Sequence, residues 1–206
     1  MLFLICFLLV AYFKESFNAI NLSVNLWSAS ISTGFFTLTA QTISVIFDTT
    51  VLIVLSFALA ILLIAFHYRR YGLLLLGTTA GDALLVTFFK TIIMSPRPLN
   101  GIIVETGYSF PSGHTTSCVV FFGVLTYFAW KQWSSSKIKA LTGGLYLSVT
   151  AVVAFDRIYL NVHWFSDIIG SVFLGAFWLT FSIFLFKKML SSRRIKDNPI
   201  EKVKRL

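Results

Sequence analysis

The stretch from residue 168 to residue 186, IIGSVFLGAFWLTFSIFLF, contains no charged side chain. A helix that crosses a bilayer needs about 20 predominantly apolar residues, so this stretch predicts a membrane-spanning helix. Four other stretches have a similar length and apolar character: Thr49 to Phe66, Tyr71 to Phe89, Thr115 to Trp130 and Ile138 to Phe155. The sequence therefore predicts an all-α integral membrane protein built as a bundle of spanning helices.

The composition of the 206-residue chain agrees with a membrane bundle. Hydrophobic residues make up 57% of it and charged residues 12%, whereas an ordinary soluble domain is about 25% charged. So few charged groups could not cover a soluble protein of this size, which excludes a soluble enzyme, a disordered chain and a disulfide-rich secreted scaffold. Cys6 and Cys118 both lie in apolar runs, so we expect no disulfide. We expect one domain over residues 1–206.

The first 47 residues allow more than one interpretation. Leu2 to Phe13 is apolar but short, and it spans only with help from flanking residues or a thinned bilayer. A signal peptide is the alternative, but no positive charge precedes the run and no clean cleavage pair follows it. We favour a first span, which gives six spans in total. Residues 17–47 are expected to form short interfacial helices between the first and second spans, with one further, poor span as the alternative.

The basic residues set the expected orientation. Thirteen of the 17 Lys and Arg side chains lie in three places, which are residues 69–70, residues 131–139 and the tail over residues 187–206. With six spans these places share one side, which the positive-inside rule makes cytoplasmic. The other four, Lys14, Lys90, Arg97 and Arg157, fall on the extracytoplasmic side. The net charge of +9 is therefore a signal of topology in a cell membrane, and we expect no nucleic-acid partner.

Ionisable side chains gather in the predicted extracytoplasmic loops. Two histidines, three cations and one carboxylate lie after the third span, before the fourth, and between the fifth and sixth. They are Lys90, Arg97, His114, Arg157, His163 and Asp167. Ionisable groups at membrane depth are costly and usually functional. We expect these six side chains to converge at one membrane face.

The chemistry that suits this set is phosphoryl transfer. Fixed cations can hold the oxygens of a phosphate dianion, and Arg can bind two of them at once. Gly113, at the start of a predicted helix, presents backbone N–H groups to an anion. His163 and Asp167 are four residues apart and share a helix face, so the carboxylate can orient the imidazole and support the cation formed on attack. His114 can then protonate the leaving oxygen.

Three segments resemble the signature of the type 2 phosphatidic acid phosphatase superfamily, which contains the membrane lipid phosphatases. That signature is Lys-x6-Arg-Pro, then Pro-Ser-Gly-His, then Ser-Arg-x5-His-x3-Asp. Residues 90–98 and 111–114 match the first two parts in full, and Arg157, His163 and Asp167 match the third, so the signature region is 90–167. Asp156 is the departure, because the family usually has Ser there. Order and spacing extend the resemblance over about residues 50–186.

The resemblance implies hydrolysis through a phosphohistidine, without a metal or another cofactor. It makes His163 the nucleophile, Asp167 its orienting partner, and His114 the general acid and later the base that activates water. It assigns phosphate binding to Lys90, Arg97, Ser112, the Gly113 amide and Arg157. The implied substrate is a phosphomonoester or pyrophosphate on a membrane lipid, of the phosphatidylglycerophosphate, phosphatidate or undecaprenyl pyrophosphate type.

Other functions are compatible with a cationic site at a membrane face. A phosphotransferase would pass the phosphoryl group to an acceptor other than water, and a phospholipid transporter or flippase would bind the lipid without cleaving it. A transporter site is expected near the midplane, between repeated halves, and no repeat is visible. Intact His114, His163 and Asp167 disfavour a non-catalytic relative. These three could also supply zinc ligands, but the surrounding cations would repel a metal ion.

Two acidic residues keep two interpretations each. Asp82, in the third predicted span, either supports the site from below or is a protonated side chain hydrogen-bonded to a neighbouring helix. Asp156 either repels a bound phosphate or holds a cation in place, and we expect the second. His67, beside the cytoplasmic Arg pair, is expected to be structural. The preferred lipid and the oligomeric state do not follow from the sequence.

Overall fold

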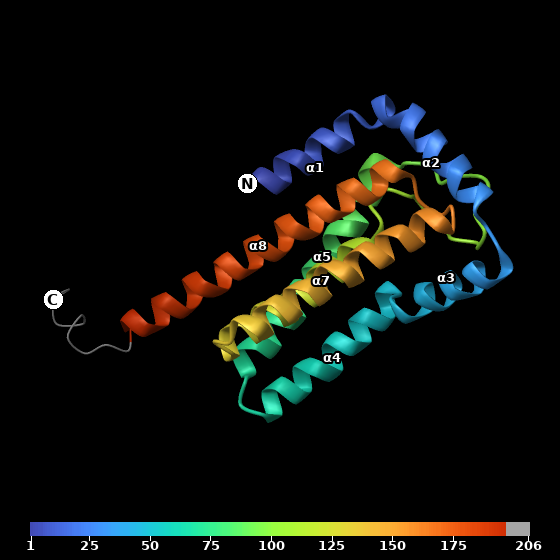
Figure 1. The fold of residues 1–206 in the computed structure, drawn as a ribbon. Helices are drawn as coiled ribbons and strands as arrows, with labels where there is room; N and C mark the ends of the chain where they lie inside the picture. The colour runs from blue at the N-terminus through green and yellow to red at the C-terminus, as the bar shows by residue number, and fades with distance from the viewer. Residues whose placement is uncertain (197–206) are drawn as a thin grey trace.

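The computed structural model describes residues 1–196, and these form a bundle of long helices (Figure 1). In chain order the elements are α1 (Leu2–Tyr12), the 3-10 helix η1 (Lys14–Phe17), α2 (Asn18–Ser30), α3 (Gly34–Ile46), α4 (Thr49–Ala65), α5 (Arg69–Ile93), α6 (Gly113–Gln132), α7 (Ser136–Tyr159) and α8 (Phe165–Lys196). Residues 1–196 contain no strand. The predicted all-α fold is confirmed.

Each expected span corresponds to a helix that begins within three residues of its predicted start. By length and composition, α5, α7 and the part of α8 up to Met189 are long and apolar enough to cross a membrane alone. Two bent pairs, α1 with residues 14–30 and α3 with α4, raise the number to five at most among the described residues. Length and composition therefore support three to five spans, fewer than the six expected.

Helix α6 is an expected span that is not among these candidates. Eleven of its 20 residues are buried, including the polar run His114 to Ser117 in its first turns. It packs against α5, α7 and α8, and polar side chains in a membrane helix face other helices rather than lipid. The polar start of α6 is thus accounted for by its central place in the bundle.

The segment between α1 and α4 forms two helices, as expected for residues 17–47. The chain bends by 75° between α1 and residues 14–30, so α2 leaves the direction of the first helix. The bend between α3 and α4 is only 44°, and Asp48 marks the break by accepting a hydrogen bond from the Thr50 N–H at 2.8 Å. Helices α3 and α4 together are a candidate for one bent span, so α3 does not add the further span that the alternative proposed.

Small residues allow α6 and α8 to pack closely. A Cβ atom built at Gly123 would lie 2.2 Å from Leu179 Cδ2, and one built at Gly175 would lie 2.8 Å from the Val119 side chain. Glycine at such crossings is common in membrane bundles, because attraction between spanning helices depends on close packing. The glycines therefore allow α6 and α8 to lie in close contact. Both helices carry expected site residues at their N-terminal ends.

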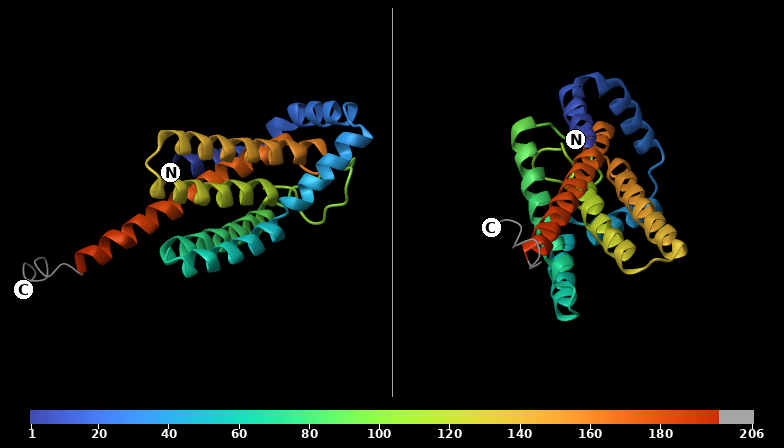
Figure 2. Two further views of the ribbon diagram at one scale, coloured as in Figure 1. Left: turned by 60° about the horizontal axis from the view of Figure 1, so that its bottom comes forward. Right: turned by 90° about the vertical axis from the view of Figure 1, so that its left-hand side faces the viewer.

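Four helix ends meet at one end of the bundle. They are the C-terminal ends of α5 and α7 and the N-terminal ends of α6 and α8, joined in part by the loop over residues 94–112. At the opposite end α8 extends beyond its neighbours (Figures 1 and 2). The basic residues 69–70 and 131–139 lie at that opposite end, at the start of α5 and the turn between α6 and α7. Residues 197–206 of the basic tail lie outside the described residues.

Candidate active site

His163 and Asp167 lie side by side at the start of α8, although His163 precedes the helix by two residues and does not share a helix face with Asp167 as expected. The His163 Nδ1 atom is 3.5 Å from Asp167 Oδ2, and the same oxygen accepts a hydrogen bond from the Trp164 backbone N–H at 2.9 Å. His163 is 4% exposed and Asp167 is 0% exposed. The carboxylate is thus held on the Nδ1 side of the ring, and Nε2 is directed elsewhere.

Arg97 lies at the other ring nitrogen of His163. Its Nη1 atom is 3.3 Å from His163 Nε2 and donates to the Val162 carbonyl at 2.9 Å. Its Nε and Nη2 atoms donate to the carbonyls of Gly107 and Thr106 at 3.1 and 3.2 Å. Three backbone carbonyls therefore fix a guanidinium group directly beside Nε2.

The surroundings of His163 favour the neutral imidazole. Burial lowers the pKa of His163 to about 4, and the charges of Arg97 and Lys90 add to this lowering while Asp167 opposes it. A neutral imidazole carries a free lone pair on one ring nitrogen. At neutral pH the ring is therefore in the form that a histidine nucleophile requires.

Arg157 is a fully buried cation at the C-terminal end of α7. Its Nε atom donates to Asp156 Oδ2 at 2.9 Å, and its Nη2 atom contacts the same oxygen. A buried charge is costly without such a partner. The adjacent pair has the geometry expected if Asp156 holds the cation in place, which is the interpretation that we favoured from the sequence.

Glu105 bridges the two arginines. One carboxylate oxygen, Oε1, lies 3.3 Å from Arg157 Nη1, and the other, Oε2, lies 3.7 Å from Arg97 Nη2. Glu105 is the one acidic residue of the 94–112 loop, and it was not predicted as part of the site. Its two oxygens contact the guanidinium nitrogens that are expected to bind phosphate, so a phosphate on those nitrogens would compete with Glu105.

The remaining predicted phosphate-binding residues border the same region. Lys90, near the C-terminal end of α5, donates to the Tyr108 carbonyl. It lies close enough to Arg97, Glu105 and Asp167 to interact electrostatically with each. The structure therefore places Lys90 near Arg97, the cation of the loop.

Ser112 and Gly113 form the start of α6. Ser112 is the N-cap residue, whose Oγ accepts from the Thr115 N–H, and its own N–H donates to Ser171 Oγ at 2.6 Å. Gly113 is the first residue of the helix, where backbone N–H groups and the helix dipole favour an anion. The predicted amide contact thus has a suitable local structure.

His114 is the second residue of α6. Its side chain faces Asp48, which lies at the junction of α3 and α4. Its Nε2 atom is 3.4 Å from Asp48 Oδ2, and the side chain is buried. It is also close enough to Arg157 and His163 to interact electrostatically with both. Asp48 was not predicted as a partner of His114, because its place before a span indicates only a helix cap.

A further cation reaches the site from the N-terminal segment. The Lys14 Nζ atom is 2.6 Å from Asp167 Oδ1 and also donates to Ser95 Oγ. The sequence analysis predicted a side of the membrane for Lys14, but it did not predict the contact between Lys14 and Asp167. No spacing rule relates residue 14 to residue 167.

Asp82 and His67 lie away from these contacts. Asp82 is buried in α5, and its Oδ2 atom accepts a hydrogen bond from Ser117 Oγ of α6 at 2.7 Å. This is the interhelical hydrogen bond that one of its two interpretations required. His67 is exposed in the turn between α4 and α5. Among residues 1–196, no group of three His, Cys, Asp or Glu side chains has the geometry of a metal site.

Comparison with known proteins identifies related sequences. The PAP2 superfamily matches residues 71–190. Phosphatidylglycerophosphatase B of Bacillus subtilis is 33% identical over 114 residues, which cover 53% of this chain and 56% of that protein. Undecaprenyl-diphosphatase of Sulfolobus acidocaldarius is 28% identical over 154 residues, which cover 71% and 66%. The chain thus spans less than two thirds of the length of either relative.

Two solved structures have a similar fold. The crystal structure of the transmembrane PAP2 type phosphatidylglycerolphosphate phosphatase from Bacillus subtilis gives a TM-score of 0.80 at 25% identity, covering 90% of this chain and 94% of that one. LpxE of Aquifex aeolicus gives a TM-score of 0.63 at 22% identity, covering 80% and 94%, and shows the likeness of fold alone. The apolar helices and this likeness identify a multi-pass membrane protein. Because the family match covers more than half of the chain and encloses all three signature segments, the chain belongs to the PAP2 superfamily.

Proposed function

We propose that the protein hydrolyses a phosphate ester or anhydride of a membrane lipid through a phosphohistidine. One observation carries the proposal: His163 has Asp167 at 3.5 Å from Nδ1 and Arg97 at 3.3 Å from Nε2. A carboxylate behind one ring nitrogen and a cation beside the other suit an imidazole that attacks a phosphorus atom. The names of the relatives, which are lipid phosphatases, support the same class of reaction.

The reaction has two steps. In the first, His163 Nε2 attacks phosphorus, an N–P bond forms, and the P–O bond to the lipid breaks while His114 gives its proton to the leaving oxygen. In the second, water attacks the phosphohistidine and gives a proton to His114, the N–P bond breaks, and phosphate leaves. Asp167 supports the charge that develops on His163 in the first step.

The cations and amides of the site stabilise the charge on the phosphoryl group. Arg97, Arg157 and Lys90 can bind its equatorial oxygens, together with Ser112 and the Gly113 N–H. Because these side chains supply positive charge on several sides, we expect catalysis to need no metal ion.

The substrate is a lipid whose head group reaches the extracytoplasmic interface. The site lies at the end of the bundle opposite the basic residues 69–70 and 131–139, and the positive-inside rule makes the basic end cytoplasmic. The lipid tail would then enter from the bilayer. Candidate substrates are phosphatidylglycerophosphate, phosphatidate and undecaprenyl pyrophosphate.

The activity is tested by phosphate release from purified lipids. The wild-type protein in detergent micelles is given phosphatidylglycerophosphate, phosphatidate, diacylglycerol pyrophosphate and undecaprenyl pyrophosphate, with and without EDTA. We expect release from at least one lipid, at a rate that EDTA does not change. No release from any of the four, or transfer of the phosphoryl group to an acceptor other than water, would contradict the proposal.

The side of the site is tested by cysteine labelling in intact cells. In a variant with Cys6 and Cys118 replaced by Ala, Leu99→Cys lies in the exposed loop beside the site, and Ser135→Cys lies in the exposed turn at the opposite end. An impermeant thiol reagent should label Leu99→Cys alone. Labelling of Ser135→Cys alone would place the site on the cytoplasmic side.

A further inference from the structure

Lys14 is the cation of the site that the proposed reaction leaves without a role. It lies in η1, outside the residues 71–190 that match the family. Its ammonium group contacts Asp167 Oδ1 at 2.6 Å and Ser95 Oγ, and it lies 4.9 Å from the centre of the Phe110 ring. The Lys14 side chain is only 16% exposed, and a buried lysine generally needs a specific partner.

The two oxygens of the Asp167 carboxylate have different partners. Oδ1 accepts from Lys14, while Oδ2 accepts from the Trp164 N–H and faces His163 Nδ1. With Oδ1 bound to Lys14, the carboxylate cannot rotate without breaking an ion pair in a buried setting. The contacts with Lys14 and with the Trp164 N–H therefore together fix the orientation of the carboxylate relative to the imidazole.

We propose that Lys14 is a positioning residue that acts on His163 through Asp167. It holds Asp167 Oδ2 toward Nδ1, and it offsets part of the carboxylate charge, which lowers the basicity of the imidazole. This inference rests on the proposed role of His163 as the nucleophile. It also assigns a part in the reaction to a segment that lies outside the family signature.

The N-terminal segment that carries Lys14 is firmly attached to the bundle. The Asn21 side chain donates to Ser166 Oγ at 3.1 Å and accepts from the Ser166 N–H at 3.0 Å. The Phe7 ring is stacked on Phe110 with centroids 5.5 Å apart. Contacts on both sides of Lys14 therefore fix its position relative to α8 and to the 94–112 loop.

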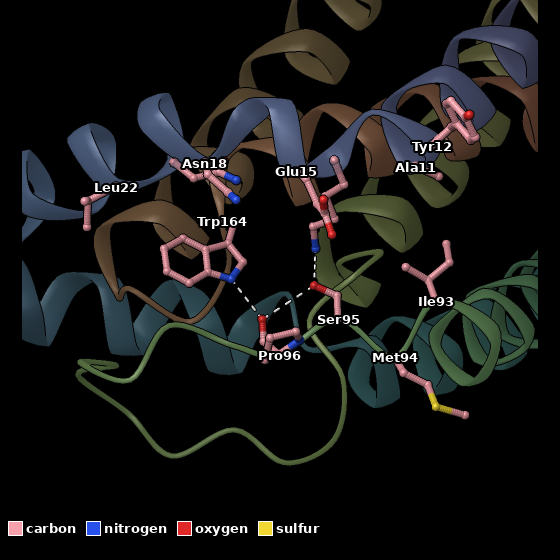
Figure 3. Close-up of a pocket in the computed structure, with 12 residues that line it drawn as sticks. Ala11, Tyr12, Glu15, Asn18, Leu22, Ile93, Met94, Ser95, Pro96 and Trp164 are labelled. Atoms are coloured by element: carbon pink, nitrogen blue, oxygen red, sulfur yellow. Dashed lines mark hydrogen bonds between the residues drawn. The ribbon is translucent and has the colours of Figure 1, made fainter.

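A cavity of about 630 Å³ lies beside this contact, between the N-terminal helices and the end of α5. Figure 3 shows Ser95, Pro96 and Trp164 on one wall, with the Trp164 indole donating to the Pro96 carbonyl at 2.9 Å. Lys14 and Glu15 also line the cavity. The ammonium group thus stands between this cavity and the buried Asp167.

The charged groups that act on His163 come from several elements. They are Asp167 of α8, Lys90 of α5, Arg97 of the 94–112 loop and His114 of α6. Lys14 of η1 acts on Asp167 directly. Among them, Lys14 can be made neutral without removing a group that is proposed to contact the phosphate or the reacting atoms.

The test compares Lys14→Met with the wild type. Met keeps the length of the side chain and removes its charge, so Asp167 should stabilise the imidazolium more strongly. We expect the pKa of His163 to rise by about one unit. The measurement is a pH titration of the three histidines by 15N NMR in labelled protein. We also expect kcat to fall about tenfold, because the loss of the contact that positions Asp167 and His163 outweighs the stronger support that the carboxylate gives to the charge on the imidazole. KM should stay within about twofold, because Lys14 does not bind phosphate.

Control variants separate charge from folding. Lys14→Arg should keep the wild-type pKa of His163. Lys14→Gln, which retains a hydrogen-bond donor without the charge, should raise it as Met does, and it serves if Lys14→Met folds poorly. Glu15→Gln removes a charge from the next, exposed position and should leave both the pKa and kcat unchanged.

An unchanged His163 pKa in the folded neutral variants would overturn the proposal, as would an equal shift in Lys14→Arg. Lys14 would then be an anchor of the N-terminal segment only. The histidine titration does not depend on turnover. If the wild type released no phosphate from any lipid, the proposed function would fail while the titration still decided whether Lys14 acts on His163.

Discussion

The region that matches the family and the N-terminal region contribute different parts of the site. Residues 71–190 carry both histidines, Asp167 and the three predicted phosphate-binding cations. The N-terminal region carries Lys14, which contacts Asp167, and Asp48, which faces His114. The signature thus carries the groups that we propose to react, while the N-terminal region carries charged partners that contact them.

The fold explains how the N-terminal region reaches both places. Helix α1 packs along α8, so the turn after α1 brings Lys14 to the start of α8. The start of α4 lies against the start of α6, where a Cβ built at Gly113 would be 3.1 Å from Thr49 Oγ1. The residue before Thr49 is Asp48, which therefore lies beside His114. Packing between elements distant in sequence thus creates both contacts.

The largest effect should come from His163→Ala, which removes the proposed nucleophile. Loss of a covalent nucleophile typically lowers kcat by about 10⁴-fold or more, measured here by phosphate release from the best lipid substrate. His67→Asn is the matched control, because His67 is exposed at the opposite end and has a φ of 67°, which Asn tolerates. Retention of wild-type turnover in His163→Ala would remove the phosphohistidine from the proposal.

The next effect should come from Asp48→Asn, which tests the partner of His114. Asn still caps α4, so the change isolates the negative charge 3.4 Å from His114 Nε2. A nearby carboxylate favours the protonated imidazole that a general acid needs. We expect kcat for lipid phosphates to fall about tenfold, measured by phosphate release.

The leaving group gives the control for Asp48→Asn. A p-nitrophenyl phosphate ester has a leaving group that needs little protonation, so the variant should hydrolyse it at close to the wild-type rate. An equal loss for both kinds of substrate would mean that Asp48 acts on the packing of α4 and not on His114.

The sequence was most informative where chemistry and spacing coincide. The apolar runs predicted the main helices. The four-residue spacing of His163 and Asp167 predicted that the two side chains share a helix face, but His163 lies two residues before α8, and the turn that leads into the helix brings the two side chains together. The contacts of Lys14, Asp48 and Glu105 could not be predicted, because each depends on packing between distant segments. The number of spans did not follow from hydropathy alone, because α6 is polar where it is buried in protein and α1 is short.

A smaller effect is expected from Asn21→Ala, which removes a link between the two regions. Asn21 of α2 makes two hydrogen bonds to Ser166 in the first turn of α8, and both residues are buried. Loss of such a buried pair should lower the free energy of unfolding by about 1–3 kcal/mol, seen as a lower unfolding temperature in detergent. Asn18→Ala, at an exposed position of the same helix, is the control. Equal unfolding temperatures for the two variants would indicate that α2 does not stabilise the start of α8.

The smallest effect is expected from Asp156→Ser, within the matched region itself. Ser is the residue that the family usually has, and its hydroxyl can accept from Arg157 but carries no charge. Asp156 and Glu105 both hold the Arg157 guanidinium, and a phosphate on that guanidinium would compete with Glu105. Asp156 is then the partner that remains while the phosphate is bound, so its loss should weaken the positioning of Arg157.

We therefore expect Asp156→Ser to raise KM for the lipid phosphate by about threefold to tenfold, the equivalent of about 1 kcal/mol, with a smaller change in kcat. Inhibition by orthovanadate should weaken by a similar factor, because it measures oxyanion binding without turnover. A lower KM for Asp156→Ser would contradict this expectation. A carboxylate beside the phosphate repels it, and relief of that repulsion would lower KM and strengthen vanadate inhibition. Asp156 would then restrain anion binding, and Arg157 would have to be held in place by Glu105 instead.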